Sequence, residues 1–311
     1  MSLLVTVPTD RLAENLGELP DGVELKIWDM KSAAPASRID IVVPPYMGSS
    51  GSLAALENLE VGLVQSQSIG YDGVLELLPA GMSYANAATV HESSTAELAV
   101  GLILAAQRQL PRFVHAQQRG EWSPVFADSL ADRHVLLVGF GGVGTAIAQR
   151  LAPFEVTMTA VASSARTEQV EGVGDVTVRS IDDLPELLPD AEIVVLSLPA
   201  TEQTRHVFDA GMIAHMAPGA LLVNVGRGPL IDTDALVDAL HAGAIRAASD
   251  VFEEEPIPAD HPLWSAPNLL ISPHVGGAST AMNPRIARLI RRQIDRMLAG
   301  EDPVNVVIPA P

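Results

Sequence analysis

Short apolar runs alternate along the chain with segments of helical periodicity. Four early runs rich in Val, Leu and Ile predict strands at 3–7, 23–27, 39–43 and 61–65. Six more predicted strands follow, at 134–140, 156–162, 192–198, 220–225, 245–249 and 269–272. Strands that alternate with helices usually pair in parallel, so the pattern predicts an α/β protein with parallel sheets.

Segments of helical character lie between these runs, at 10–15, 52–57, 73–78, 93–110, 143–151 and 284–299. In the longest of them, Ser94 is placed to cap the first turn with Glu97 three residues on, and Pro111 is expected to end the helix. Residues 119–133 are polar and predict irregular structure.

Composition narrows the function classes. A chain of 311 residues has room for two domains with cores of their own. Its 38 acidic and 19 basic residues give a net charge of −19, which argues against binding to nucleic acid or to an anionic membrane surface. Without cysteine there is no disulfide, thiolate catalysis or Cys-based metal site. We find no apolar run of about 20 residues and no signal-peptide pattern, and expect a cytoplasmic protein.

A glycine-rich turn joins a predicted strand to a predicted helix. Gly139-Phe140-Gly141-Gly142-Val143-Gly144 matches G-x-G-x-x-G. In this setting Gly139 permits a tight turn, Gly141 lets the backbone approach a pyrophosphate, and Gly144 allows close helix packing. The anion would then meet the free amides at the helix N-terminus. The sequence therefore predicts a dinucleotide-binding site.

The end of the next strand bears on the choice of cofactor. NAD-specific sites carry an acid about 20 residues after the first glycine, but here the chain reads Ala162-Ser163-Ser164-Ala165-Arg166. Serine hydroxyls and an arginine are suited to a 2′-phosphate, so we predict a preference for NADP. The alternative is a polar loop in an enzyme that uses NADP or NAD.

Downstream motifs complete a larger pattern. They are VVLSLPATEQTRHVF (194–208), LLVNVGRGPLID (221–232), ASDVFEEEPIPADHPLW (248–264) and LLISPHVGG (269–277). With the glycine loop, their order and spacing resemble the D-isomer-specific 2-hydroxyacid dehydrogenase family, which includes glyoxylate and hydroxypyruvate reductases. The resemblance implies two Rossmann- or flavodoxin-like domains and a homodimer. It also implies that a nucleotide domain, 98–278, is inserted into a discontinuous substrate domain, 1–97 plus 279–311.

The resemblance also implies site residues. The catalytic set is Arg227 as the substrate-binding arginine, Glu255 as the partner of the histidine, and His274 as the acid/base. Glu253 and Glu254 are close enough in sequence to confuse the second assignment. The loop of Ser68, Ile69 and Gly70 would bind the substrate carboxylate through backbone amides. Beyond Gly139, Gly141, Gly142, Val143 and Gly144, the implied cofactor-binding residues are Thr95, Leu198, Pro199, Thr204, Val225, Asp250 and Gly276.

These residue types suit the chemistry. Hydride addition to a keto carbon leaves negative charge on its oxygen, so a proton donor is needed nearby, and histidine titrates near neutrality. A carboxylate such as Glu255 would favour the imidazolium and raise its pKa. Arg227 offers a rigid fork for a carboxylate and a carbonyl oxygen. The other histidines show no HxxxH or HExxH spacing, so no metal site is expected.

Some positions leave two interpretations open. The first 60 or so residues match the family poorly, and Tyr46 and Met47 follow a strand there, either lining a substrate pocket or forming a turn with a packed aromatic. Trp264 belongs either to the pocket or to the core. Glu155 stands where many family members have glycine, and we expect only an altered turn.

The sequence as a whole favours an NADP(H)- or NAD(H)-dependent reductase that converts a small 2-keto acid to a D-2-hydroxy acid. The competing hypothesis is a dinucleotide-sensing binding protein of the same fold, without turnover. A formate dehydrogenase is disfavoured because those relatives place Gln where Glu255 stands.

Overall fold

The chain divides into two compact units. The computed structural model describes residues 2–310. The first unit holds the residues up to His91 and those from Gly277 onward, and the second unit is Glu92–Gly276. The breaks expected from the sequence lie a few residues later. Helix α4 (Glu92–Gln107) explains the first difference, because a continuous helix packed on its own core belongs to one unit as a whole.

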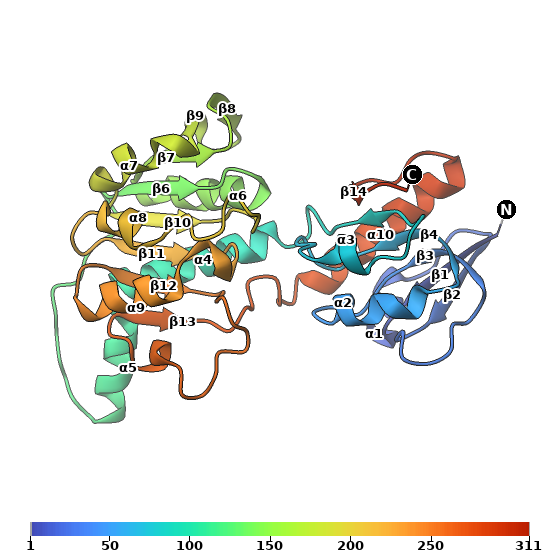
Figure 1. Cartoon of the computed structure of the whole chain (residues 1–311), viewed down its shortest axis with the longest axis horizontal. Helices are drawn as coiled ribbons and strands as arrows, with labels where there is room; N and C mark the ends of the chain where they lie inside the picture. Colours follow the sequence, from blue (N-terminus) through green and yellow to red (C-terminus); the bar gives the residue numbers. More distant parts are fainter. Residues whose placement is uncertain (1, 311) are drawn as a thin grey trace. The chain divides into compact units, whose positions relative to one another are not determined.

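A six-stranded sheet forms the centre of the first unit (Figure 1). Its described strands, in spatial order, are β14 (Val306–Ile308), β5 (Tyr84–Ala85), β4 (Glu60–Gln65), β3 (Arg38–Val42), β1 (Leu3–Val7) and β2 (Val23–Ile27). All pairs are parallel except β14 with β5. Helices α1 (Asp10–Leu16) and α10 (Met282–Ala299) share one core, and α3 (Val74–Leu77) packs on the other. Helix α2 (Ser49–Ser52) directly precedes the 3-10 turn Leu53–Leu56, which packs on that second core.

The second unit is built on an eight-stranded sheet. Its described strands run in the spatial order β13 (Leu269–Ile271), β12 (Arg246–Ser249), β11 (Leu221–Asn224), β10 (Ile193–Leu196), β6 (His134–Val138), β7 (Thr157–Ala162), β9 (Gly174–Ser180) and β8 (Arg166–Val170). Only β8 and β9 pair antiparallel. Helices α4 and α6 (Gly142–Leu151) pack on one core. The other core takes α7 (Leu184–Leu187), α8 (Ala210–Ala214) and α9 (Thr233–His241). The predicted α/β class with mostly parallel sheets is confirmed.

The predicted long helix is wrong in detail. Helix α4 begins at Glu92, so Ser94 lies inside its first turn and is not the cap. The helix ends at Gln107, and Gln109 adopts a left-handed conformation with φ 53°. A second helix, α5 (Leu110–Gln118), then begins, with Pro111 in its first turn. Proline is tolerated there because its missing N–H would have no helical partner.

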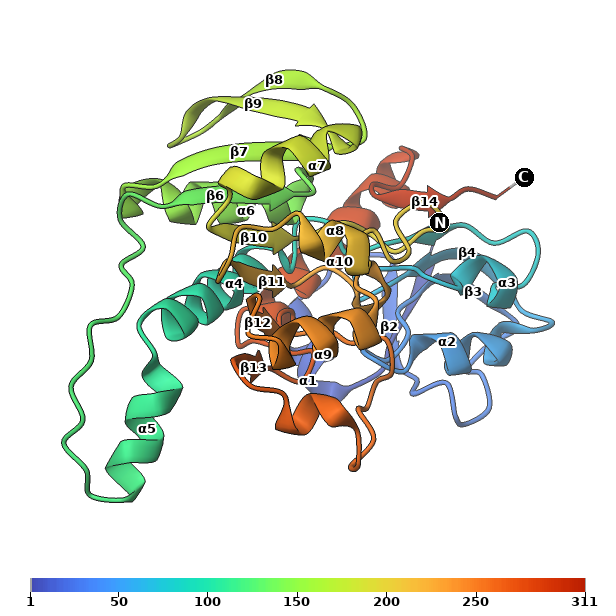
Figure 2. The same ribbon diagram turned by 60° about the vertical axis from the view of Figure 1, so that its left-hand side comes forward.

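The hairpin β8–β9 was not predicted. Its strands are largely polar, and only Val170, Val176 and Val178 are buried. Residues 121–133 are irregular, as expected, and Figure 2 shows this stretch returning from α5 towards β6 as an extended segment. Single turns of 3-10 helix occupy Leu53–Leu56, Ala152–Phe154, Ile181–Asp183, Leu188–Asp190, Gly228–Leu230 and Pro262–Ser265.

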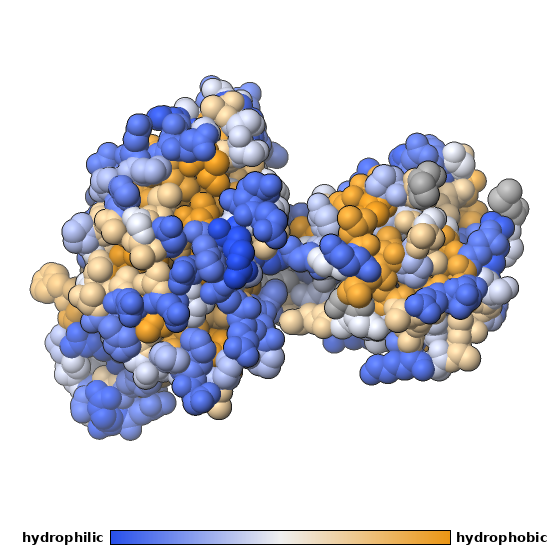
Figure 3. Space-filling view, in the orientation of Figure 1, coloured by the Kyte–Doolittle hydropathy of each residue, from blue (hydrophilic) through white to orange (hydrophobic). Residues whose placement is uncertain are grey.

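Hydrophilic side chains cover much of the face seen in Figure 3, in keeping with the net charge of −19. Within residues 2–310, no helix combines the length and the apolar character needed to cross a membrane.

Candidate active site

The predicted cofactor and catalytic residues gather where the strands of the second unit end. Strands β10 and β7 both pair with β6, one on each side. The chain order reverses at this point in the sheet, because β7 follows β6 directly and β10 comes later. Ligands of open α/β sheets bind at the carboxyl ends of the strands beside such a reversal. The turns after β6, β7, β10, β11, β12 and β13 hold the residues described below.

The glycine loop follows β6. Gly139 has φ 105°, a conformation that side chains rarely adopt, and a Cβ on Gly144 would lie 2.1 Å from the Gly139 carbonyl oxygen. Gly141 is different: it has φ −97°, and a Cβ there would meet no atom within 4 Å. Neither strain nor internal packing explains glycine at this position. Open space beside the first amides of α6 fits a pyrophosphate, so these residues suit a dinucleotide.

Ser163 and Ser164 lie between β7 and β8, and Arg166 is the first residue of β8. All three are exposed, and Arg166 reaches back to the glycine loop, donating a hydrogen bond to the Phe140 carbonyl oxygen at 3.0 Å. The same guanidinium binds Glu168 through Nε at 2.9 Å and Nη2 at 2.7 Å. Glu168 therefore lies beside the predicted phosphate-binding residues, although the sequence places it beyond the turn.

His274 and Glu255 form a close pair. Nδ1 of His274 lies 2.6 Å from Oε2 of Glu255, and Oε1 of Glu255 accepts a hydrogen bond from the Phe252 amide at 2.8 Å. The side chain of His274 keeps 42% of its surface exposed. Glu255 thus holds one ring nitrogen and leaves Nε2 as the nitrogen available to a ligand. An imidazole held this way can give and take a proton.

The pair shifts the pKa of both its members. The hydrogen bond to Glu255 raises the pKa of His274 above its ordinary value, and this outweighs the opposing effect of burial. Burial tends to raise the pKa of Glu255, but the hydrogen bonds from His274 and the Phe252 amide outweigh it, so the pKa is lowered. The Arg227 charge lowers the pKa of both groups, which places this arginine in the same electrostatic neighbourhood.

Arg227 stands on a tight turn after β11. The buried Asn224 shapes this turn: its amide donates to the Arg227 carbonyl oxygen at 2.9 Å, and its Oδ1 accepts from the Gly226 amide at 3.0 Å. A Cβ on Gly228 would lie 1.9 Å from the Phe252 carbonyl oxygen. Glycine is therefore required here, because the turn that carries Arg227 packs directly against the turn that carries Glu255.

Asp250 is buried and binds the loop that contains His274. Its Oδ1 accepts hydrogen bonds from the Ser272 hydroxyl at 2.5 Å and the Val275 amide at 2.9 Å, and its Oδ2 accepts from the Gly276 amide at 2.8 Å. The His274 amide donates to the Asp250 carbonyl oxygen at 2.7 Å. These four bonds fix the path of the loop.

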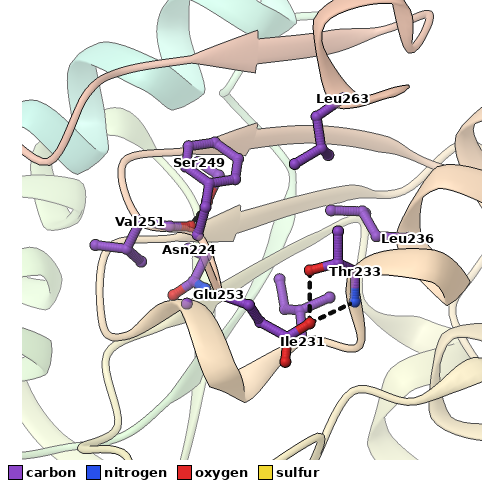
Figure 4. Close-up of a pocket in the computed structure, with 10 residues that line it drawn as sticks. Asn224, Ile231, Thr233, Leu236, Ser249, Val251, Glu253 and Leu263 are labelled. Atoms are coloured by element: carbon purple, nitrogen blue, oxygen red, sulfur yellow. Dashed lines mark hydrogen bonds between the residues drawn. The ribbon is translucent and has the colours of Figure 1, made fainter. Parts of the chain in front are cut away.

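Glu253 forms a separate cluster that the sequence did not indicate. Its Oε2 accepts from the Thr233 amide at 3.0 Å and hydroxyl at 2.6 Å (Figure 4), and its Oε1 lies 2.7 Å from Nε2 of His206. Burial tends to raise the pKa of Glu253, but the hydrogen bonds from His206 and Thr233 outweigh it and lower the pKa. Glu254 is exposed. Successive glutamates therefore face different neighbours, and only Glu255 meets His274.

The remaining predicted cofactor residues belong to the same edge of the second unit. A Cβ on Gly276 would lie 3.1 Å from Oδ2 of Asp250 and 3.3 Å from Cγ2 of Thr95. The others follow β10 or β11: Leu198, Pro199, Thr204 and the buried Val225. Thr204 closes its own turn by donating to the Pro199 carbonyl oxygen at 2.8 Å.

The first unit carries the predicted substrate loop after β4. The Ser68 amide donates to the Ser66 hydroxyl at 2.9 Å. Among the hydrogen bonds of residues 2–310, none is donated by the amide of Ile69 or of Gly70. Both amides are therefore open to an anion.

The three positions with two interpretations, Tyr46, Met47 and Trp264, differ in how they pack. Tyr46 stacks on the buried His91 with a centroid separation of 5.7 Å, as expected for a packed aromatic, whereas Met47 is 62% exposed. Trp264 is 54% exposed and donates to the Pro258 carbonyl oxygen, so its placement in the core is wrong. Within the described part of the chain, no three His, Asp or Glu residues are grouped as a metal site.

Comparison with known proteins decides the family. Residues 100–276 match the family model described as D-isomer specific 2-hydroxyacid dehydrogenase, NAD binding domain. The chain belongs to this family. Among relatives of the dehydrogenase, glyoxylate/hydroxypyruvate reductase B from Citrobacter koseri is 34% identical over 85% of the chain and 84% of the relative.

Solved structures of relatives superpose on nearly the whole chain of the dehydrogenase. A D-isomer specific 2-hydroxyacid dehydrogenase family protein from Aeromonas salmonicida is 28% identical with a TM-score of 0.85, over 98% of both chains. A D-isomer specific 2-hydroxyacid dehydrogenase from Xanthobacter autotrophicus, in complex with NADPH and MES, is 29% identical with a TM-score of 0.80, also over 98% of both chains. The predicted family and fold are confirmed, and the dehydrogenase is an NAD(P)-dependent oxidoreductase of 2-hydroxy acids.

Proposed function

We propose that the dehydrogenase reduces a small 2-keto acid, such as glyoxylate or hydroxypyruvate, to the D-2-hydroxy acid, preferring NADPH but also using NADH. The observation that carries this proposal is the hydrogen bond of 2.6 Å between His274 and Glu255, together with Arg227, whose charge lowers the pKa of both groups. The names of relatives that are glyoxylate/hydroxypyruvate reductases support the substrate class.

His274 is the proposed acid. When bound, the nicotinamide supplies the hydride that adds to the keto carbon. Nε2 of His274 gives its proton to the keto oxygen, which becomes the hydroxyl, while Glu255 stabilises the ring as it changes charge. Because the hydrogen bond to Glu255 raises the pKa of His274, the protonated form persists to higher pH.

Arg227 and the loop of Ser68, Ile69 and Gly70 are the proposed substrate-binding groups. The open amides of Ile69 and Gly70 suit the carboxylate of the substrate. The guanidinium of Arg227 binds the carboxylate and the keto oxygen, which fixes the face presented to the hydride. Tyr46 packs on His91 in the same unit and is proposed to border this site.

The dinucleotide is proposed to lie along the carboxyl edge of the second unit. The glycine loop would hold the pyrophosphate, and Ser163, Ser164 and Arg166 the 2′-phosphate of NADPH. Thr95, Leu198, Pro199, Thr204, Val225, Asp250 and Gly276 would surround the nicotinamide half.

The first test is oxidation of NADPH and NADH, side by side, with glyoxylate, hydroxypyruvate, pyruvate and phenylpyruvate. We expect turnover with at least one of the smaller acids. His274→Ala should lower kcat by about 10²–10⁴-fold and leave the Kd for NADPH nearly unchanged, while His241→Ala, which changes an exposed histidine at the end of α9, should have no effect. Tight NADPH binding without turnover on any acid would instead favour a dinucleotide-sensing protein.

We also propose a homodimer, with α5 and residues 119–129 as its interface. This segment exposes apolar side chains: Trp122 is 96% exposed, Phe126 107% and Val114 52%. Arg112 and Arg119 lie in this segment, and in a chain of net charge −19 their positive charges reduce the repulsion between two copies at this surface. Apolar side chains exposed together in this way mark association sites.

The test of the dimer is the molar mass in solution, measured by light scattering. The wild-type protein should have twice the molar mass of one chain. The double variant Trp122→Ser, Phe126→Ser should have a molar mass closer to that of one chain. Leu75→Ser, which removes an apolar residue that is 68% exposed on α3, should leave the mass unchanged. A wild-type protein with the mass of one chain would refute the proposal.

A further inference from the structure

An ion pair occupies the proposed 2′-phosphate site. Arg166 and Glu168 are two residues apart on β8, so their side chains share one face of the strand. Both are about one-third exposed, with side-chain exposures of 37% and 35%. Their position beside the glycine loop is fixed by the bond from Arg166 to the Phe140 carbonyl oxygen.

The guanidinium of Arg166 is largely satisfied by the protein itself. Nε and Nη2 donate to Glu168, Nη2 also donates to Phe140, and Nη1 donates to the Ser164 carbonyl oxygen at 3.3 Å. An arginine has five N–H donors, so one remains for a ligand. A 2′-phosphate can bind this arginine through a fork of two donors only if one of these four bonds breaks, and Glu168 accepts two of them.

Glu168 also suits the other cofactor. In NAD-specific sites a carboxylate at the end of the strand that corresponds to β7 accepts hydrogen bonds from the adenosine ribose, and Glu168, held by Arg166, brings a carboxylate to this region from β8. A negative charge beside a 2′-phosphate repels it, whereas a ribose hydroxyl is neutral and is not repelled. The same pair therefore has one group suited to NADP(H) and one suited to NAD(H).

We infer that Glu168 is a specificity-determining residue that restrains the preference for NADP(H) by holding Arg166, and so keeps NAD(H) usable. This inference rests on the proposed function, since it takes the adenosine end of the cofactor to lie at Ser163, Ser164 and Arg166. It assigns the discrimination between the cofactors to the Arg166–Glu168 pair.

The test is the Kd of NADP⁺ and of NAD⁺ by titration calorimetry on the full-length protein without substrate. The oxidised cofactors differ only in the 2′-phosphate, and no turnover is involved. Glu168→Gln removes the charge and keeps an oxygen that can accept from Arg166. It should raise the ratio Kd(NAD⁺)/Kd(NADP⁺) by about tenfold. Arg166→Gln should weaken NADP⁺ by about tenfold or more and leave NAD⁺ within about twofold.

Glu171→Gln is the matched control. Glu171 is an exposed acid in the turn of the same hairpin, so this variant lowers the net negative charge equally without touching Arg166. It should change either Kd by less than about twofold, because exposed charges at a distance are screened. The ratio of kcat/KM for NADPH and NADH should follow the ratio of Kd values.

The outcomes separate the two hypotheses. If Glu168→Gln leaves the ratio unchanged, or acts no differently from Glu171→Gln, the inference is overturned although the proposed function stands. If Arg166→Gln weakens both cofactors equally, Arg166 serves only the glycine loop and the inference is again overturned. If wild type binds neither dinucleotide, the proposed function fails and the inference fails with it.

Discussion

The Asp250 carbonyl oxygen accepts a hydrogen bond from the His274 amide at 2.7 Å, so the buried acid is bonded to the backbone of this histidine. Its carboxylate binds the two amides that follow, at Val275 and Gly276. Asp250 therefore controls where the imidazole points, although the direct partner of the ring is Glu255. His274 itself has φ 53°, a left-handed conformation that these bonds sustain.

Asp250→Asn should displace this loop. An amide group has one acceptor, so at least one of the backbone amides of Val275 and Gly276 would face an N–H. We expect a loss of about 1–3 kcal/mol in the free energy of unfolding and a fall of at least about tenfold in kcat. Urea unfolding and steady-state kinetics measure both. Asp238→Asn, on α9, is the control and should change neither; equal losses in the two variants would contradict the assignment.

Glu255→Gln should move the pH profile of reduction. In wild type the hydrogen bond to Glu255 raises the pKa of His274, so the acid form needed for reduction persists above the ordinary pKa of about 6.5. The variant loses the charge that stabilises imidazolium, and kcat/KM should begin to fall at lower pH. The profile of kcat/KM against pH, with the same buffers for both proteins, checks the direction. A shift to higher pH would exclude Glu255 as the partner.

The same pair should make stability depend on pH. The raised pKa of His274 contributes stability below about pH 6.5, lost as pH rises through the folded value. The lowered pKa of Glu255 contributes stability above about pH 4.3, lost as pH falls through the folded value. Both contributions are present in full between these two values. The difference in unfolding free energy between wild type and Glu255→Gln should therefore be greatest there and shrink on either side.

Glu253→Gln should lower the free energy of unfolding while leaving the pH profile of catalysis unchanged. The carboxylate joins Thr233 and His206 to the turn that leads to Glu255, and the amide would leave one donor without an acceptor. We expect a loss of about 1–3 kcal/mol in unfolding free energy, with an unchanged pH profile of kcat/KM. Glu254→Gln alters the adjacent exposed residue and should change neither. A shifted pH profile in Glu253→Gln would show that this residue acts on His274 directly.

Glu155→Gly should stabilise the protein. Glu155 has φ 60° and ψ 34°, the left-handed region, which costs a side chain about 1–2 kcal/mol, while glycine loses about 0.5–1 kcal/mol more entropy on folding. The expected net gain is about 0.5–1 kcal/mol, seen as a higher Tm by calorimetry. Glu155→Ala keeps a Cβ and should show no gain. The positive φ also fits the expectation that many family members have glycine at this position.

Strands of the second unit were predictable where they are buried on both faces. Ile193–Leu196 and Leu221–Asn224 are buried throughout, and apart from the terminal Asn224 they appear in the sequence as apolar runs. Hairpin β8–β9 has one buried face, and its alternating polar residues leave no such run. Helix α9 also has a signal in the sequence, an Asp232 cap followed by Leu236 and Leu240, four residues apart.

The residues of the candidate site also differ in whether the sequence could predict them. His274, Glu255 and Arg227 were predicted because their flanking residues form motifs. Glu253 and Glu168 were not, since each depends on where the backbone turns. Three consecutive glutamates look alike in sequence, but the path of that turn sends one to Thr233, one to solvent and one to His274. The i, i+2 spacing of Arg166 and Glu168 becomes meaningful only once β8 is known to be a strand.

The ends of the second unit adjoin one another. In the first unit, Nδ1 of His91 lies 3.2 Å from the Gly277 carbonyl oxygen, so the chain departs after His91 and returns at Gly277 a few ångströms away. Residues 92–276 can therefore be treated as a cassette that a gene could acquire or exchange as a block without pulling apart the sheet that hosts it. A short peptide that joins residue 91 to residue 277 should connect the two segments of the first unit into one domain. The nucleotide-binding unit of another dehydrogenase could then be inserted at the same place.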